Sequence, residues 1–355
     1  MRALLMVEAG RLEMDDIAVP EVREGWALVR TVASAAGLFH TQMVKGMLDT
    51  GGLPRILGHE IIGEIVEAGS PASPPPGTLV VADAVVGCGV CEWCIRGEDS
   101  ICPWMHHLGI DLDGGFAEYV LAPEANIFPL PSDINVQEAV MLSSAVPATV
   151  HAVSKVGVDA GMRVAVSGVG SIGFSVCQVA KAFGATTIVA ADVSDAQLEA
   201  VAPWVDATVN VTEMTPAQAD AAMREAGGVE HGFDVGFETA GQASSVDTTI
   251  KVLRPGGSAM MMGIVDGRTA INFDSYLAEF VRREVSFVTT FGFTRKDFLI
   301  GNALYLGGRL DVSPLVGPTV TLDEVPATLE HIVEHGTGGK RYVVDVGIGS
   351  TGRFV

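Results

Sequence analysis

The feature that most constrains the fold of this chain is a glycine-rich turn, Gly168-Val-Gly-Ser-Ile-Gly173. It follows the apolar run 164–167 and precedes the stretch 172–183, in which apolar residues recur at helical spacing. The first glycine of such a turn permits a tight bend, the second lets backbone amides approach a phosphate, and the third lets the helix pack on the strand. The pattern therefore predicts a strand, a turn and a helix whose N-terminus is open to an anion.

From residue 163 onward, short β-branched runs alternate with helix-length amphipathic stretches. This alternation is typical of βαβ units on a parallel sheet. The runs predicted to be strands are 163–167, 186–191, 207–210, 233–238, 257–263 and 285–290. Helices are expected over 172–183 and 244–253. Six strands in this arrangement indicate an α/β fold with a doubly wound, parallel Rossmann sheet that binds a dinucleotide.

An acidic residue stands where such a sheet places a ribose ligand. Asp192 ends the second predicted strand, and its carboxylate would accept hydrogen bonds from an adenosine ribose. The same charge would repel the 2′-phosphate of NADP, so NAD(H) is the predicted cofactor. The residues predicted to bind it are Gly168, Gly170, Ser171, Ile172, Gly173 and Asp192, with Thr239 and Gly263 after later strands. The alternative is a glycine turn without a ligand and an aspartate that only caps a helix.

The first part of the chain, residues 1 to about 150, has a different rhythm. Alternating apolar residues and turn signals predict strands over 27–32, 60–67 and 78–82. Since 355 residues exceed the usual size of a single core, we expect two domains. They are a mainly-β domain over 1–150 and a Rossmann domain over 151–289, and residues 290–355 return to the first.

Composition excludes several classes of protein. Hydrophobic residues make up 48% of the chain and charged residues 18%, which excludes a disordered or fibrous chain. The chain has 43 Asp and Glu against 22 Lys and Arg, and its net charge of −21 disfavours nucleic acid or an anionic membrane as partner. We find no run of about 18 apolar residues, as a bilayer span requires, and no signal peptide. We therefore expect a soluble, cytoplasmic protein.

Four of the five cysteines lie in one short segment: Cys88, Cys91, Cys94 and Cys102. Four thiolates suit tetrahedral Zn²⁺, and a site closed by four ligands has no position for a substrate. Such a metal would stabilise a loop too small for its own core. The segment thus predicts one structural zinc, with disulfides as the alternative. Cys177 is expected in the core, and His106 and His107 in a solvated loop.

Two further motifs, with the cysteines and the glycine turn, resemble the zinc alcohol dehydrogenases of the medium-chain dehydrogenase/reductase superfamily. They are Gly58-His-Glu with Gly63, and Gly114-Gly-Phe-Ala-Glu-Tyr119. The resemblance covers essentially the whole chain. It implies a GroES-like catalytic domain, split in sequence, together with the Rossmann domain. It also implies a homodimer or homotetramer that acts on a small-molecule substrate.

At two positions the sequence departs from this family. In the family, a catalytic zinc has three protein ligands: a Cys, the His of Gly-His-Glu, and a Cys, Asp or Glu at the third position. His59 is present, but Phe39 stands at the first position and Ser144 at the third, and neither is a competent zinc ligand. The chain therefore resembles members that lack the catalytic zinc. His40 or Ser143 could rebuild a metal site, but adjacent side chains of an extended segment point to opposite sides.

The remaining residues at these positions form the predicted reaction site. Thr41 occupies the position at which relatives carry the hydroxyl of a proton relay. It is therefore the candidate donor to the substrate. His59 and Glu60 are candidate acid–base groups, or else an inert pair. In relatives, the residue at position 40 faces the cofactor phosphates, so His40 is expected to bind the pyrophosphate. The residues expected to line the substrate pocket are Phe39, Trp104 and Ser144.

A site without catalytic zinc limits the chemistry that the chain can perform. An iminium already carries the charge that a metal would induce, and an α,β-unsaturated carbonyl spreads the added charge over an enolate. We therefore expect NADH-dependent reduction of an activated C=C or C=N bond. One alternative is an NAD-dependent alcohol dehydrogenase or ketone reductase with a rebuilt metal site or a side-chain acid or base. The other is an NAD-binding sensor or scaffold without turnover.

Overall fold

The computed structural model describes residues 1–47, 50–71, 73–263 and 276–347. The chain divides into two compact units. Unit 1 comprises Met1–Pro147, Gly292–Leu299 and Val312–Val355, and unit 2 comprises Ala148–Phe291 and Ile300–Asp311. Residues 300–311, expected in the mainly-β domain, thus belong to unit 2. Gln178 holds them there, because its side chain bonds the backbone N–H and C=O of Asp311 at 2.7 and 2.8 Å.

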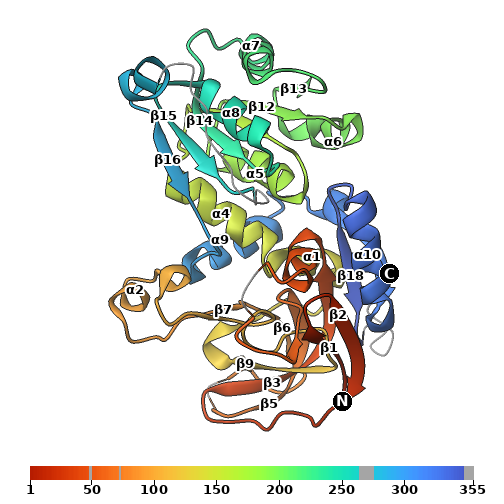
Figure 1. Ribbon diagram of the computed structural model, residues 1–355. Helices are drawn as coiled ribbons and strands as arrows, with labels where there is room; N and C mark the ends of the chain where they lie inside the picture. Colours follow the sequence, from red (N-terminus) through yellow and green to blue (C-terminus); the bar gives the residue numbers. More distant parts are fainter. Residues whose placement is uncertain (48–49, 72, 264–275, 348–355) are drawn as a thin grey trace. The chain divides into compact units, whose positions relative to one another are not determined.

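Unit 1 is built mainly from β-strands (Figure 1). Its larger sheet has the order β10 (Ile127–Pro129), β6 (Leu79–Ala82), β5 (Ile61–Ala68), β3 (Trp26–Ala36), β18 (Arg341–Asp345) and β17 (Val316–Thr321), with β9 (Tyr119–Pro123) also paired to β3. A second sheet has the order β2 (Arg11–Asp16), β1 (Arg2–Glu8) and β4 (Arg55–Ile56). Because β18 pairs antiparallel with β3, the C-terminal segment completes the larger sheet.

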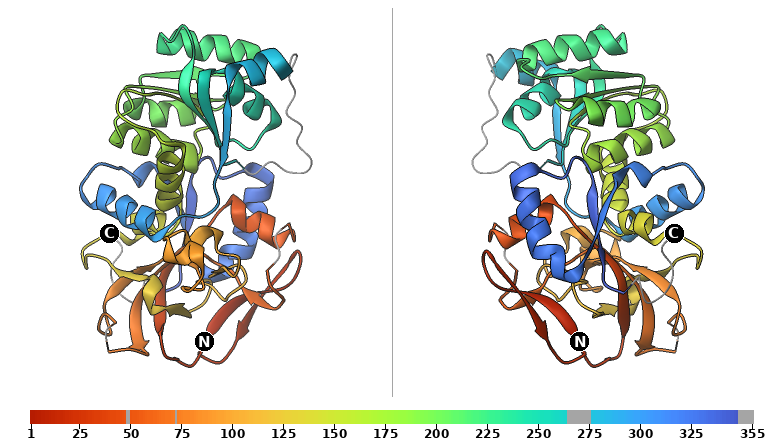
Figure 2. Two further views of the ribbon diagram at one scale, coloured as in Figure 1. Left: turned by 90° about the vertical axis from the view of Figure 1, so that its left-hand side faces the viewer. Right: turned by 90° about the vertical axis from the view of Figure 1, so that its right-hand side faces the viewer.

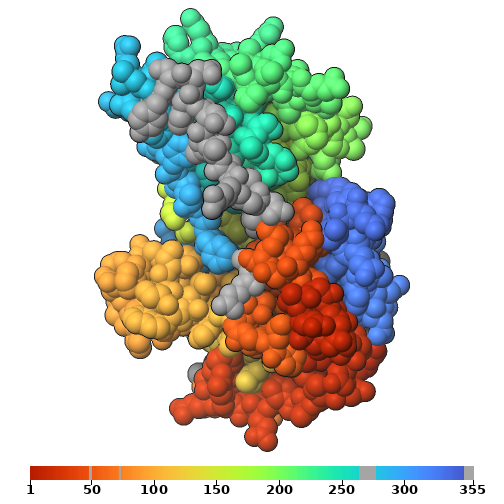
Figure 3. Space-filling model, viewed as in Figure 1, coloured from red at the N-terminus to blue at the C-terminus, as the bar shows by residue number. Residues whose placement is uncertain are grey.

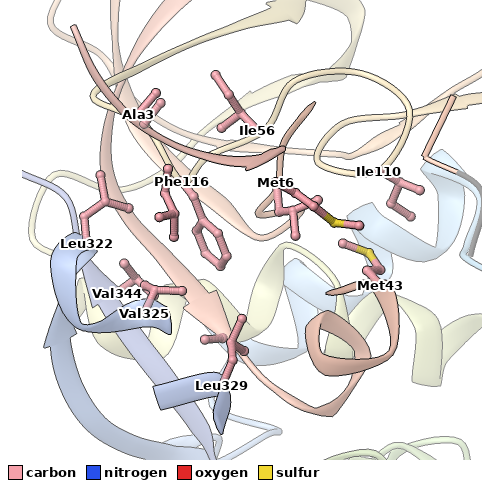
Figure 4. Packing of buried hydrophobic residues seen from close by; sticks show 14 of the residues in the cluster. Ala3, Met6, Met43, Ile56, Ile110, Phe116, Leu322, Val325, Leu329 and Val344 are labelled. Atoms are coloured by element: carbon pink, nitrogen blue, oxygen red, sulfur yellow. The ribbon is translucent and has the colours of Figure 1, made fainter. Parts of the chain in front are cut away.

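The apolar core of unit 1 anchors the short helix α1 (Leu38–Val44). Figure 4 shows Met43 of this helix close to Met6, with Phe116 in the same cluster. Helix α10 (Val325–His335) contributes Leu329 to the cluster. Burying each such side chain stabilises the fold by about 1.5–3 kcal/mol. The core therefore fixes the position of α1, which carries three of the predicted site residues.

Unit 2 contains the predicted six-stranded parallel sheet, which confirms the α/β fold. Its order is β13 (Ala207–Asn210), β12 (Thr187–Asp192), β11 (Arg163–Ser167), β14 (Phe233–Glu238), β15 (Leu253–Met261) and β16 (Ser286–Thr289). The helices that cover both faces (Figure 2) are α5 (Ser171–Ala182), α6 (Asp195–Val201), α7 (Pro216–Gly227) and α8 (Ala243–Lys251). Strand β15 begins at Leu253, four residues before the predicted start at residue 257. Its pairing with β14 already begins there, and the register between the two strands shifts before Ser258.

One helical stretch differs from the expectation about membrane spans. Val136–Val156 is long and apolar enough to cross a bilayer, with a mean hydropathy of 1.2. It comprises α3 (Val136–Ala139), η3 (Val140–Leu142) and α4 (Ala145–Val156). Because 67% of it is buried inside the fold, its packing already accounts for its apolar composition. No continuous apolar run marks this stretch in the sequence, because Ser143 and Ser144 interrupt it.

Candidate active site

The four clustered cysteines converge in a protrusion of unit 1 that carries α2 (Glu92–Ile95) (Figures 1 and 3). Their sulfur atoms all lie within 4.8 Å of one another, with Cys88 and Cys94 4.0 Å apart and Cys91 and Cys102 3.6 Å apart. Four thiolates around tetrahedral zinc, each about 2.3 Å from the metal, would be separated by about 3.8 Å. The four cysteines are free thiols, so the disulfide alternative does not hold. Their geometry fits the predicted structural zinc.

The glycine turn after β11 has the form that a dinucleotide site requires. Gly168 has a φ of +93°, and a Cβ at that position would lie 2.7 Å from the loop after β14. A Cβ at Gly173 would lie 1.9 Å from the carbonyl oxygen of Gly168. By contrast, no heavy atom lies within 4 Å of the Cβ position at Gly170. Helix α5 begins with no side-chain cap, so the amides of Ser171 and Ile172 remain available to a phosphate.

The carboxylate of Asp192 is fixed at the end of β12. Its Oδ2 accepts a hydrogen bond from the Val169 amide at 2.7 Å, and its Oδ1 accepts one from the Ser194 amide at 2.9 Å. An ionised carboxylate has about four acceptor positions, so two remain for the hydroxyls of a ribose. The position is therefore compatible with the predicted ribose contact.

Glu238 joins the two loops that carry the remaining predicted cofactor residues. Its backbone carbonyl accepts a hydrogen bond from the amide of Gly263, and the neighbouring Thr239 donates its hydroxyl to the carbonyl of Gly168 at 2.5 Å. The donors to its Oε1 are Ala240 N, Gly241 N and Ser245 Oγ. Its Oε2 is buried without a partner among the described residues, and a Cβ at Gly263 would lie 2.2 Å from it. The segment 238–241, which this glutamate begins, follows the fourth predicted strand, and from the sequence it is expected to approach the nicotinamide half of the cofactor.

Three imidazoles from separate segments of unit 1 meet in one cluster. His40 lies on α1, His59 follows β4, and His107 lies on β8 (His106–His107). The rings of His40 and His59 are stacked with centroids 4.6 Å apart, and the ring of His107 meets His59 edge-on at 5.8 Å. Phe39 meets His59 edge-on at 5.2 Å. Residues 39 and 40 are helical, not extended as expected, and both of their rings therefore contact His59.

Close packing of backbone on backbone brings the segment with His107 to this cluster. Gly58 has a φ of +96°, and a Cβ there would lie 2.7 Å from the ring of Phe116. A Cβ at Gly109 would lie 2.4 Å from the carbonyl carbon of Gly58. The amide of Gly115 then donates to the carbonyl of Gly58 at 2.7 Å. Side chains at these positions would force the two segments apart.

Burial keeps the imidazoles of the cluster uncharged near neutral pH. It lowers the pKa of His40 to about 3, with a further contribution from the positive charge of Arg341. Burial also lowers the pKa of His59 well below its usual 6.5, and the neighbouring His40 and His107 add to this effect. The pKa of His107 is lowered by burial as well. The cluster therefore provides neutral rings that can donate and accept hydrogen bonds.

A buried ion pair lies beside the imidazoles. Glu60 is 1% exposed, and its Oε1 lies 3.4 Å from Nε of Arg341, which is the first residue of β18. Burial raises the pKa of Glu60, and the charge of Arg341 opposes that shift. The two atoms are close enough to attract, but their alignment does not make a hydrogen bond. Arg341 was not predicted as a site residue, although a basic residue at the start of the apolar run 342–344 is a signal that could have indicated it.

Several buried polar atoms of this cluster lack a partner among the residues that the structure describes. Nδ1 of His40 accepts a hydrogen bond from the Gly37 amide at 3.3 Å, so in the neutral ring the hydrogen is on Nε2, which is buried and unpaired. The other unpaired atoms are Nδ1 of His59, Oε1 of Glu60 and Nε of Arg341. Buried polar atoms normally find a partner. The cluster is therefore suited to binding a polar ligand or ordered water.

The structure distributes the other predicted site residues unevenly. Thr41 is 4% exposed, and its hydroxyl donates to the Leu38 carbonyl at 2.7 Å, so it acts as a donor elsewhere only if this bond breaks. Ser144 is half-buried between η3 and α4. Trp104 is 62% exposed and lies beside Cys102 in the protrusion. The roles of these residues and of His40 remain predictions.

The prediction of a solvated loop is correct for His106 and wrong for His107. His106 is exposed, and its Nδ1 lies 2.9 Å from Asp111. His107 is 9% exposed, because β8 directs neighbouring side chains to opposite sides. A pair of histidines on one short strand is the signal that could have placed one of them inside.

The residues around His59 do not fit a zinc ion held by three side chains. Phe39 presents an aromatic ring to His59, and such a ring is not a zinc ligand. Within the described ranges, the four cysteines are the one group of three or more potential ligands whose donor atoms lie within 4.8 Å of one another. The imidazoles of His40 and His107 reach His59 but do not form such a group with it.

Comparison with known proteins identifies both units. The sequence pattern of the alcohol dehydrogenase GroES-like domain matches residues 23–132, and that of the zinc-binding dehydrogenases matches residues 171–301. The chain is similar to D-xylulose reductase A of Aspergillus oryzae, with 30% identity over 305 residues, which are 83% of this chain and 82% of the relative. A second relative, from Aspergillus terreus and named "Probable D-xylulose reductase A", is 31% identical over 82% of this chain and 81% of its own length.

Solved structures agree with this assignment. An NAD-dependent alcohol dehydrogenase is 28% identical, with a TM-score of 0.87 over 98% of this chain and 100% of its own. A zinc-binding dehydrogenase of Sinorhizobium meliloti 1021 bound to NADP is 25% identical, with a TM-score of 0.88 over 97% and 99% of the two chains. The chain therefore belongs to the zinc-binding alcohol dehydrogenase family of medium-chain dehydrogenases/reductases, and it is an NAD(P)-dependent oxidoreductase with a structural zinc site.

Proposed function

We propose that this dehydrogenase works without a zinc ion in its reaction site and reduces an activated C=C or C=N bond with NADH. The observation that carries the proposal is the pair of replaced ligands. Phe39 and Ser144 stand where the family binds its catalytic zinc, and the ring of Phe39 packs against His59. A metal bound by His59 alone would lack the other protein ligands of a stable site.

The size of the missing electrostatic effect limits the substrate. A catalytic zinc lowers the pKa of bound water by up to about 9 units, which corresponds to a ceiling of about 12 kcal/mol. One hydrogen-bond donor at an oxyanion contributes about 3–4 kcal/mol. Neutral donors such as the imidazoles beside His59 fall short of the metal for a simple ketone. They suffice more readily for an enolate, whose charge is delocalised, or for an iminium, which is already electrophilic.

The remaining elements of the proposal concern the cofactor and the state of the protein. We infer NADH in preference to NADPH, because the carboxylate of Asp192 is held by two backbone amides where the 2′-phosphate would approach. One of the similar structures binds NADP, so this preference depends on Asp192 and not on the family. We also infer a cytoplasmic homodimer or homotetramer that acts on a small molecule.

A second candidate function is the interconversion of an alcohol and a ketone. The similarity to proteins named D-xylulose reductases favours it. In that case a side chain, or a metal site rebuilt around His40 and His59, would have to handle the proton. A sensor or scaffold that binds NADH without turnover remains the alternative from another class.

The test measures NADH oxidation with cyclohex-2-enone, 1-pyrroline and D-xylulose, each with and without a mild chelator. Our proposal predicts oxidation with the enone or the imine and no effect of the chelator. Oxidation with D-xylulose alone, abolished by the chelator, would support the second candidate and refute the proposal. Binding of NADH without oxidation by any acceptor would support the sensor. As a check on the ligand positions, Phe39→Cys combined with Ser144→Cys should bind one additional zinc per chain.

A further inference from the structure

We propose that Glu238 is a positioning residue for the cofactor, and that its carboxylate fixes the two loops that would receive the nicotinamide half of a dinucleotide. Glu238 ends β14 and is 1% exposed. All of the residues involved belong to unit 2. The inference depends on the NAD(P)-dependent activity of the family, and it does not depend on the proposed substrate or on the state of the zinc site.

The order of the parallel sheet determines on which side of the glycine turn each half of a dinucleotide lies. The turn follows β11, and Asp192 ends β12 on one side of it, whereas β14 and β15 lie on the other side. A dinucleotide whose pyrophosphate lies at the turn and whose adenosine ribose meets Asp192 extends its second half across the carboxyl ends of β14 and β15. The loops at these ends contain residues 239–241 and 262–263.

The loop after β14 packs directly against the glycine turn. The Thr239 hydroxyl donates to the carbonyl of Gly168 at 2.5 Å, and the Thr239 amide donates to the carbonyl of Ser167 at 3.0 Å. A Cβ at Gly168 would lie 2.7 Å from the Cβ of Ala240. The conformation of this loop therefore shapes the space immediately beside the expected phosphate position.

Glu238 binds both loops at once. Its backbone carbonyl accepts hydrogen bonds from the amides of Met262 at 2.9 Å and Gly263 at 3.0 Å, in the loop after β15. The donors to its Oε1 are the amides of Ala240 (3.0 Å) and Gly241 (2.8 Å) and the hydroxyl of Ser245 (2.5 Å). Hydrogen bonds to a carboxylate are stronger than those between neutral groups. One side chain thus holds the loop after β14 and the start of α8 together.

The second carboxylate oxygen occupies the space in which a side chain at residue 263 would lie. Oε2 of Glu238 is buried without a partner among the described residues. A Cβ at Gly263 would lie 2.2 Å from this oxygen and 2.4 Å from the amide nitrogen of Gly241. Glycine at 263 therefore lets the loop after β15 approach both the carboxylate and the loop after β14. A substitution at Glu238 or at Gly263 should displace the same two loops.

The adenosine side of the site is held by other bonds. The carboxylate of Asp192 accepts the amides of Val169 and Ser194, and neither bond involves Glu238. Loss of the Glu238 carboxylate should therefore weaken binding of the nicotinamide half and leave binding of the adenosine half intact. This selectivity distinguishes a positioning role from a general contribution to folding.

The test measures, by isothermal titration calorimetry, the dissociation constants of NADH and of ADP, which lacks the nicotinamide half. We expect Glu238→Ala to weaken NADH binding roughly 10-fold and ADP binding by less than about 2-fold. Glu238→Gln retains an oxygen that can accept the same three hydrogen bonds, so its NADH affinity should stay within about 3-fold of wild type. The matched control is Asp234→Ala, which removes a carboxylate with several donors from the opposite end of β14. It should lower the melting temperature without changing either dissociation constant.

Gly263→Ala is an independent variant that disturbs the same contact by steric overlap, and it should show the same selective loss of NADH affinity. If the melting temperature shows that Glu238→Ala does not fold, Gly263→Ala decides by the same criteria. Unchanged NADH affinity in the folded variant, or equal weakening of NADH and ADP, would overturn the inference. A wild type that binds NADH no more tightly than ADP would also overturn it, since the nicotinamide half would then add nothing to binding. None of these measurements uses a substrate, so their outcome is independent of the proposed function.

Discussion

Replacing Arg341 with methionine should leave Glu60 as an uncompensated buried carboxyl group. Glu60 is 1% exposed, and the arginine side chain, itself 12% exposed, is the cation beside it. Removing one partner of a buried ion pair typically costs about 3–5 kcal/mol. The folded variant can limit this cost by protonating Glu60.

The pH dependence of that cost follows from the direction of the pKa shift. The pKa of Glu60 in the folded protein is raised above its ordinary value of 4.5, and loss of Arg341 raises it further. A carboxyl with a raised folded pKa favours the folded state at low pH, and this advantage is lost as the pH rises. Protonating a carboxyl of pKa 4.5 costs about 1.36 kcal/mol per pH unit above that value. Protonation of Glu60 therefore limits the electrostatic destabilisation of Arg341→Met to about 0.7 kcal/mol at pH 5 and to about 4.8 kcal/mol at pH 8.

The assay is urea unfolding at pH 5 and pH 8, followed by tryptophan fluorescence. Arg341→Met should be far more destabilised at pH 8 than at pH 5, and Glu60→Gln combined with Arg341→Met should recover most of the loss at pH 8. Arg309→Met removes an exposed arginine and should change stability by less than about 0.5 kcal/mol. A loss in Arg341→Met that is equal at both pH values, or that the second substitution does not relieve, would refute the reasoning.

Three other outcomes follow from the structure. Cys94→Ser should bind no zinc and should make the protrusion sensitive to trypsin, which elemental analysis and digestion would show, because three ligands no longer close the site. Asp192→Ala should raise the KM for NADH roughly 10-fold and lower that for NADPH, as steady-state kinetics would show, because the carboxylate that faces the ribose is gone. Gly58→Ala should destabilise the chain by more than about 1 kcal/mol in urea unfolding, since its φ is +96° and its Cβ would lie 2.7 Å from Phe116. An unchanged zinc content in Cys94→Ser, an unchanged KM in Asp192→Ala or an unchanged unfolding midpoint in Gly58→Ala would contradict the corresponding prediction.

The Rossmann sheet was predictable because its signals are local. The glycine turn, the first two apolar runs and Asp192 lie within thirty residues of one another, and each element forms where its own sequence favours it. The cysteine site was predictable for the same reason, since ligand spacing along one short segment determines the chemistry. Strand β15 began earlier than predicted, because a register shift depends on its neighbour β14 and not on its own composition.

The imidazole cluster could be predicted only in part, because it depends on contacts between distant segments. His59 was recognisable from its motif, but its neighbours come from α1 and β8, which the backbone contact between Gly58 and Gly109 brings together. The expectation of an extended chain at residues 39–40 failed, because this segment is a helix anchored by Met43 in the core. Arg341 reaches Glu60 from nearly 300 residues away, and no local pattern encodes that distance.

Elemental analysis of the purified full-length chain tests the central claim most directly. The account predicts one zinc per chain, and the same content in His59→Ala, because the metal is held by the thiolates of the protrusion. Two zinc ions per chain, one of which is lost in His59→Ala, would contradict it.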